Sequence, residues 1–148
     1  MYRDDEVIDF DLLNTTNQVP VGEQWLTITD YTVFLFQRKR TAYKEMAVFT
    51  MRHETGSTLE HEVFVRAVKT DGSFERPSLE FVRFCRKALR DEDLQRVSFE
   101  SLPGCALRCE VRRRNGKSYI AKIYRHDAVL PQKRDKSLII TDLGGIRP

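Results

Sequence analysis

The stretch CALRCEVRRRNGKSYIAKIYRH, residues 105–126, predicts a β-hairpin. Its two halves, 105–114 and 117–126, are rich in residues that suit strands, and Asn115 and Gly116 separate them. Asn-Gly between such runs favours a two-residue turn, because both turn positions need a positive φ angle. The predicted tip is strongly basic, which either keeps the end of a sheet soluble or binds an anionic partner. The basic residues beside the turn are Arg112, Arg113, Arg114 and Lys117.

Three further strands are predicted upstream of this hairpin. The first is 25–36, WLTITDYTVFLF, which is long for one strand, so we expect a bend or bulge near Asp30. The second is 45–53 and the third is 60–68, and both alternate between two faces. Of the aromatic residues in these strands, we expect Phe34 or Phe36, together with Phe49 and Phe64, to be buried.

Between the third strand and the hairpin, the apolar period changes to that of a helix over 76–90, RPSLEFVRFCRKALR. Pro77 fits the first helical turn, where its missing N–H is not needed. The basic residues of the segment, Arg83, Arg86, Lys87 and Arg90, are expected on the face opposite the apolar one. The apolar face comprises Leu79, Phe81, Val82, Cys85, Ala88 and Leu89.

The order of three strands, a helix and two strands predicts a mainly β protein with one helix. This order resembles the OB-fold, a five-stranded, partly open barrel whose helix lies between strands 3 and 4. We assign 1–20 as an acidic N-terminal leader, 21–127 as the OB-like domain and 128–148 as an extended C-terminal tail. The resemblance implies that the loops between strands 1 and 2 and between strands 4 and 5 flank the ligand face.

Both of those loops are basic and each contains an aromatic residue. Cations can follow the phosphates of a nucleic acid, and exposed rings can stack on its bases. The half-exposed Trp and Tyr residues are the better candidates for stacking, because their polar atoms suit such sites. The predicted nucleic-acid-binding residues are Trp25, Arg38, Lys39, Arg40, Tyr43, Lys44, Arg112, Arg114, Lys117 and Tyr119.

Several segments are similar to the small single-stranded DNA-binding proteins of bacteriophage replication and recombination cassettes. These are PVGEQWLTITDY, with its early glycine, then PSLEFVRFCRKAL, LPGCALRCEV and GKSYIAKIYR. The resemblance implies non-catalytic, sequence-tolerant binding of single-stranded DNA, or of RNA, and contact with replication or recombination proteins. The chain departs from many such proteins because it ends DLGGIRP instead of in an acidic tip.

The charge distribution agrees with a polyanionic partner. Five acids and one arginine give the first 20 residues a charge of −4, so the rest of a chain of net charge +3 carries +7. No apolar run is long enough to span a membrane, and the acidic start lacks the features of a secretory signal. We therefore expect a cytoplasmic protein, in the host cell if it is phage-encoded. The three cysteines, Cys85, Cys105 and Cys109, are expected to be buried small hydrophobes.

No catalytic, metal or cofactor site is predicted. Phosphate-loop, dinucleotide-binding and nucleophile-elbow motifs are absent, and the three histidines lack ligand spacing. One alternative is a metal-dependent nuclease, since Glu110-Val111-Arg112 resembles the E-x-K of such enzymes, although an arginine cannot act as a general base. The other alternative is a protein-interaction module that docks acidic partners, with the leader 1–20 either docking on a partner or occupying the basic groove.

Overall fold

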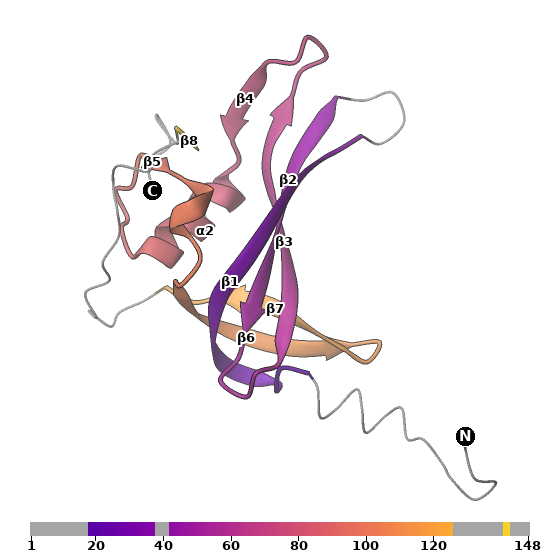
Figure 1. The fold of residues 1–148 in the computed structure, drawn as a ribbon, viewed down its shortest axis with the longest axis vertical. Helices are drawn as coiled ribbons and strands as arrows, with labels where there is room; N and C mark the ends of the chain where they lie inside the picture. Colours follow the sequence, from indigo (N-terminus) through magenta and orange to yellow (C-terminus); the bar gives the residue numbers. More distant parts are fainter. Residues whose placement is uncertain (1–17, 38–41, 126–140, 143–148) are drawn as a thin grey trace, which may run out of the picture.

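The computed structural model describes residues 18–37, 42–125 and 141–142 of the chain. Its elements are β1 (Gly22–Phe36), β2 (Tyr43–Arg52), β3 (Thr58–Val68), β4 (Phe74–Pro77), α2 (Leu79–Leu89), β5 (Arg96–Val97), the 3-10 helix η1 (Phe99–Ser101), β6 (Ala106–Arg114), β7 (Lys117–Ile123) and β8 (Thr141–Asp142). The predicted class, mainly β with one helix, is confirmed (Figure 1). No helix in the described part of the chain has the length and apolar character needed to cross a membrane.

The strands form an open six-stranded sheet and not the predicted five-stranded barrel. All neighbours are antiparallel, in the order β4-β3-β2-β1-β6-β7, and β5 pairs separately with β8. β3 and β7 approach each other without forming a ladder, so the sheet curls but does not close. The helix covers one side of the curled sheet (Figure 1).

β1 organises the sheet because its two halves have different partners. Residues 22–27 pair with β6, and residues 27–36 pair with β2. The register shifts between Ile28 and Asp30, which confirms the predicted bulge near Asp30. The β1–β2 and β6–β7 hairpins therefore leave opposite ends of β1.

The additional strand is β4, which lies within the segment predicted as helix and turn. It pairs with the end of β3 at Arg66 and Val68, and it ends at the buried Pro77. A proline is tolerated there because β4 is an edge strand. The helix begins after Pro77, not around it. Ser78 is its N-cap and accepts a hydrogen bond from the backbone N–H of Phe81 at 3.1 Å.

Two positions in the helix differ from the predicted faces. Leu79 is exposed, because it lies in the first turn at the rim of the core. Arg86 was expected on the solvent face, yet it is only 7% exposed. Its guanidinium donates through Nε and Nη2 to the carbonyl oxygen of Leu94, at 3.1 and 3.0 Å. Arg86 therefore ties the loop after α2 to the helix.

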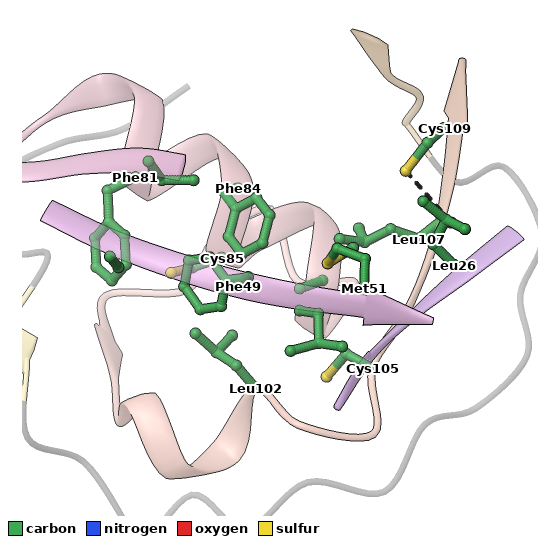
Figure 2. Packing of buried hydrophobic residues seen from close by; sticks show 14 of the residues in the cluster. Leu26, Phe49, Met51, Phe81, Phe84, Cys85, Leu102, Cys105, Leu107 and Cys109 are labelled. Atoms are coloured by element: carbon green, nitrogen blue, oxygen red, sulfur yellow. Dashed lines mark hydrogen bonds between the residues drawn. The ribbon is translucent and has the colours of Figure 1, made fainter. Parts of the chain in front are cut away.

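The core lies between α2 and the inner face of the sheet (Figure 2). Phe49 of β2 stacks on Phe84 of α2, with ring centroids 4.5 Å apart. Phe49 is buried as predicted, whereas Phe64 is only half-buried.

The cysteine prediction is confirmed, since all three are buried and free. Burial raises the pKa of the Cys109 thiol to about 12, so it remains a protonated small hydrophobe. The cysteines are Cys85, Cys105 and Cys109.

The turn between β6 and β7 has the predicted conformation. Asn115 and Gly116 have φ angles of 51° and 76°, which match the positive values required by a two-residue hairpin. The segment just before β1 is attached to this turn. The side chain of Gln18 donates to the carbonyl of Gly116, and its Oε1 accepts from the N–H of Ser118 at 2.5 Å. Val19 is fully buried, so the folded domain begins before β1.

Most of the predicted leader and tail, and all of the loop residues Arg38, Lys39 and Arg40, lie outside the described residues. Within the predicted tail 128–148, the backbone of Thr141–Asp142 forms β8. It pairs antiparallel with Arg96–Val97, so this part of the tail returns to the domain.

Candidate nucleic-acid interface

The β6–β7 hairpin brings four of the predicted binding residues together. Arg112 lies directly opposite Tyr119, and Arg114 lies opposite Lys117. The guanidinium carbon of Arg114 is 5.2 Å from the centroid of the Tyr119 ring. Arg112 also forms an ion pair with Glu110, with Nη2 and Oε2 2.8 Å apart. All three cations are exposed, so charge and a half-buried ring share one surface, which we call the basic hairpin (112–119).

Trp25 lies on the outer face of β1, which is the face of the sheet opposite the core. It is 46% exposed, and its neighbour Leu26 is fully buried. Its cross-strand partner is Arg108, and the guanidinium carbon of Arg90 is 6.0 Å from its ring centroid. The ring is therefore exposed next to cationic side chains, as a stacking residue requires.

A second ring on the β6–β7 side, which the sequence analysis did not select, is Tyr124. Arg108 and Lys122 both lie beside it, each with its charged centre 5.0 Å from the ring centroid. Arg108 is also paired with Glu23 at 3.2 Å. The period-two pattern of β6 could have identified Arg108, since it lies on the same face as Arg112 and Arg114.

The other predicted residues with described positions lie at the opposite end of β1. Lys44 is on the outer face, with its ammonium nitrogen 5.6 Å from the centroid of the Phe64 ring. Tyr43 is exposed, but as the neighbour of Lys44 it points to the other face. The described positions therefore place Tyr43 and Lys44 on different sides of the same hairpin.

The end of the β1–β2 hairpin exposes four consecutive apolar residues, and we call this end the β1–β2 arm (33–36 and 43–46). Phe34 is aligned with Met46, which is aligned with Phe64, and Phe36 is aligned with Lys44. Directly opposite residues share a face, so these rings lie on the outer face. Phe36 is 48% exposed. The prediction that Phe34 or Phe36 is buried is wrong, because the arm extends beyond the part of the sheet that packs on the core.

The opposite face of the arm is also apolar. Val33 and Leu35 are aligned with Ala47 and Glu45, on the side that faces the core lower in the sheet. Leu35 is 56% exposed. The sequence VFLF does not alternate between apolar and polar residues, so it is consistent with apolar side chains on both faces of the strand. A fully buried strand shows the same pattern, so the sequence alone did not reveal the exposure.

Two acidic residues of β3 also lie on the outer face, beside the arm and the basic hairpin. Glu62 is opposite Val48 and Glu60 is opposite Thr50, so two exposed carboxylates lie on the outer face of β3. The outer face therefore holds two groups of rings and cations with an acidic strip beside them.

The nuclease alternative would require a metal site. No three His, Cys, Asp or Glu side chains within 18–37 and 42–125 are placed to hold a metal ion. The carboxylate of Glu110, which the nuclease alternative requires as a metal ligand, is engaged by Arg112. No protein-family model matches the chain, and no curated protein matches it by sequence.

Proposed function

We propose that this protein binds single-stranded nucleic acid, most readily DNA, without catalysis and with little sequence preference. The observation that carries the proposal is the repeated pairing of a solvent-accessible ring with a cation on the outer face of the sheet. The described pairs are Trp25 with Arg90, Phe64 with Lys44, Tyr119 with Arg114, and Tyr124 with Arg108 and Lys122.

Such pairs supply both of the interactions that a single strand offers. Cations near the rings neutralise phosphates and release counterions, while each stacked base contributes about 1–3 kcal/mol. Every base has a π face, so stacking of this kind tolerates any sequence. An extended strand lying along the outer face would meet rings from β1, β3 and β7 in turn.

The strand connections support the finer proposal of an open OB-like fold. β1 pairs with β2 in one half and with β6 in the other, and α2 precedes the β6–β7 hairpin. β7 then approaches β3 without pairing. In an OB-fold, which is itself partly open, the two hairpins at the ends of β1 would border the ligand face. A role in coating strands during phage or bacterial replication or recombination follows from the resemblance of the sequence alone.

The proposal is tested by the fluorescence anisotropy of labelled oligonucleotides. Polythymidine, a mixed-sequence strand, the matching duplex and an RNA strand are compared at two salt concentrations, about 50 and 200 mM. We expect similar affinities for the two DNA strands, weaker binding of the duplex, and a slope of log K against log salt near −0.7 per neutralised phosphate. A preference for the duplex, or tight binding that salt does not weaken, would contradict it.

One observation favours the protein-interaction alternative. The arm is apolar on both faces, and aliphatic side chains such as Val33 and Leu35 do not stack on bases. Exposed apolar patches of this kind often mark protein contacts. Substituting Val33 and Leu35 with serine separates the two functions, because strand binding should remain while binding to a protein partner through this face should be abolished.

A further inference from the structure

The gap where the sheet fails to close is spanned by side chains from α2. Glu80 accepts a hydrogen bond from the N–H of Phe64 on β3 at 3.3 Å. Lys87 donates to the carbonyl of Ile123 on β7 at 2.9 Å. These two side chains satisfy backbone groups on the facing edges of β3 and β7, which would otherwise lack partners. The helix thus supplies side-chain partners to two strand edges that form no ladder with each other.

Between those edges lies a cavity of about 320 Å³. Its apolar floor includes Phe84, and His61 stacks on that ring with the centroids 5.8 Å apart. Its titratable groups are His61 on β3, Glu80, Arg83 and Lys87 on α2, and Lys122 on β7, and burial lowers the pKa of His61, which favours its neutral form. Three permanent cations therefore line the cavity against one carboxylate, which already accepts a hydrogen bond from β3.

The cations are not neutralised by the rest of the described chain. Within residues 18–37 and 42–125, Arg83, Lys87 and Lys122 take part in no ion pair. Burial, followed by the positive charges of Arg83 and Lys122, lowers the pKa of Lys87. The three charges thus act on one another, and an anion between them would relieve the repulsion.

We propose that this cavity binds a phosphate group, either free phosphate or a terminal phosphate monoester of a nucleotide or strand. Arg83 supplies a planar guanidinium that can donate to two phosphate oxygens, and Lys122 and Lys87 add point charges from the other sides. The cavity volume is at the small end of ligand sites, which suits a phosphate with at most one attached nucleoside. The cavity shares Lys122 with the pair at Tyr124, but phosphate binding there does not require that a strand binds at the outer face.

The test is a titration of the full chain with inorganic phosphate, followed by amide chemical shifts in NMR spectra. We expect saturable shifts at residues 83, 87 and 120–123. Arg83→Gln and Lys122→Gln should each weaken binding about fivefold or more, because each removes one cation from the site. Glu80→Gln should tighten binding, because the amide keeps an acceptor for the Phe64 N–H while the negative charge is removed. Shifts that do not saturate would overturn the proposal.

The matched control is Lys69→Gln, which removes one exposed cation from the turn between β3 and β4 that does not line the cavity. It should leave phosphate binding unchanged, and an equal loss in Lys69→Gln and Arg83→Gln would overturn the proposal. Thermal midpoints verify that each variant is folded. Lys122 is exposed at the edge strand, so its variant remains informative even if the Arg83 variant unfolds.

Two dinucleotides identify the source of the phosphate. A thymidine dinucleotide with a 5′-phosphate that binds more tightly than inorganic phosphate would assign the cavity to strand ends, and equal binding would assign it to free phosphate. A 5′-hydroxyl dinucleotide that binds as well as the phosphorylated one would contradict recognition of the terminal phosphate. None of these probes is long enough to report on strand coating, so their results stand whether or not the outer face binds single strands.

Discussion

The two hairpins at the ends of β1 expose opposite kinds of surface. The β1–β2 arm presents four consecutive apolar residues of β1, with Lys44 beside them. The basic hairpin presents four exposed cations, three of them on the face of one half-buried ring, that of Tyr119. If both bind one strand, the arm contributes mainly stacking and the basic hairpin contributes mainly phosphate contacts. These contributions differ in their dependence on salt, because stacking releases few counterions.

The largest effect is expected from reversing charge on the basic hairpin. The change Arg112→Glu, Arg114→Glu and Lys117→Glu replaces attraction by repulsion at several phosphates. Binding of a single strand should weaken by about a hundredfold at low salt, and the salt slope should become shallower by about 0.7 for each phosphate that is no longer neutralised. Anisotropy at four salt concentrations measures both quantities. The fold should survive, because all three side chains are exposed.

The control for this change cannot be the set of arginines on α2, since Arg86 is buried and binds the Leu94 carbonyl. A better set is Lys69→Glu, Arg76→Glu and Arg96→Glu, which reverses three exposed charges outside the basic hairpin. We expect only a small, general loss from the changed net charge. If this set weakens binding as much as the hairpin set does, the basic hairpin has no special role.

Sequence reasoning predicted the basic hairpin well and the arm poorly, for a physical reason. Asn115 and Gly116 determine their turn locally, and period two then determines which cations share a face. Whether Phe34 or Phe36 is buried depends instead on how far the core extends along β1. That limit is set by α2 and η1, through contacts distant in sequence such as Phe49 with Phe84 and Tyr31 with Phe99.

The same distinction explains the errors in the fold. The bulge near Asp30 was predicted from the length of the strand itself. The strand β4 was missed because its partner in the described sheet is the distant end of β3, and because Pro77 suits the first turn of a helix equally well. Closure of the sheet depends on whether β3 and β7 meet. Here Glu80 and Lys87 bind the backbone of those two edges, and no local pattern reveals this.

The second largest effect is expected from the outer face of the arm. Substituting both Phe34 and Phe36 with alanine removes two exposed rings and should weaken single-strand binding about tenfold, which is within the range for one or two stacked bases. The salt slope should not change, in contrast to the hairpin variant. The comparison variant is Val33→Ala with Leu35→Ala on the opposite face, which should bind normally. If both variants lose the same affinity, the arm acts through its general apolar character and not through stacking.

A smaller effect is expected at Tyr119, the ring within the basic hairpin. Tyr119→Ala should weaken binding about fivefold and change the salt slope less than the charge reversal does, because stacking releases few counterions. Tyr119→Phe keeps the ring and should bind almost normally. Equal losses in the two variants would mean that the hydroxyl, and not the ring, interacts with the strand. In that case the basic hairpin would bind through polar and charged groups alone.

The smallest effect concerns the acidic leader, which joins the folded domain beside the basic hairpin. Gln18 contacts Gly116 and Ser118, and Ser118 Oγ donates to the carbonyl of Val19 at 2.7 Å. A truncation must therefore stop at residue 17, because losing Val19 would open the core.

Residues 1–17 carry five acids and one arginine, a charge of −4. If they compete with phosphates for the basic hairpin, their removal should tighten strand binding about fivefold at low salt. The effect should be smaller at ~150 mM salt, because charges are then screened within about 8 Å. In the charge-reversed hairpin the same truncation should not tighten binding, because the leader then has no cationic surface to occupy. Equal tightening in both backgrounds would mean that the leader acts through net charge alone and not by occupying the hairpin.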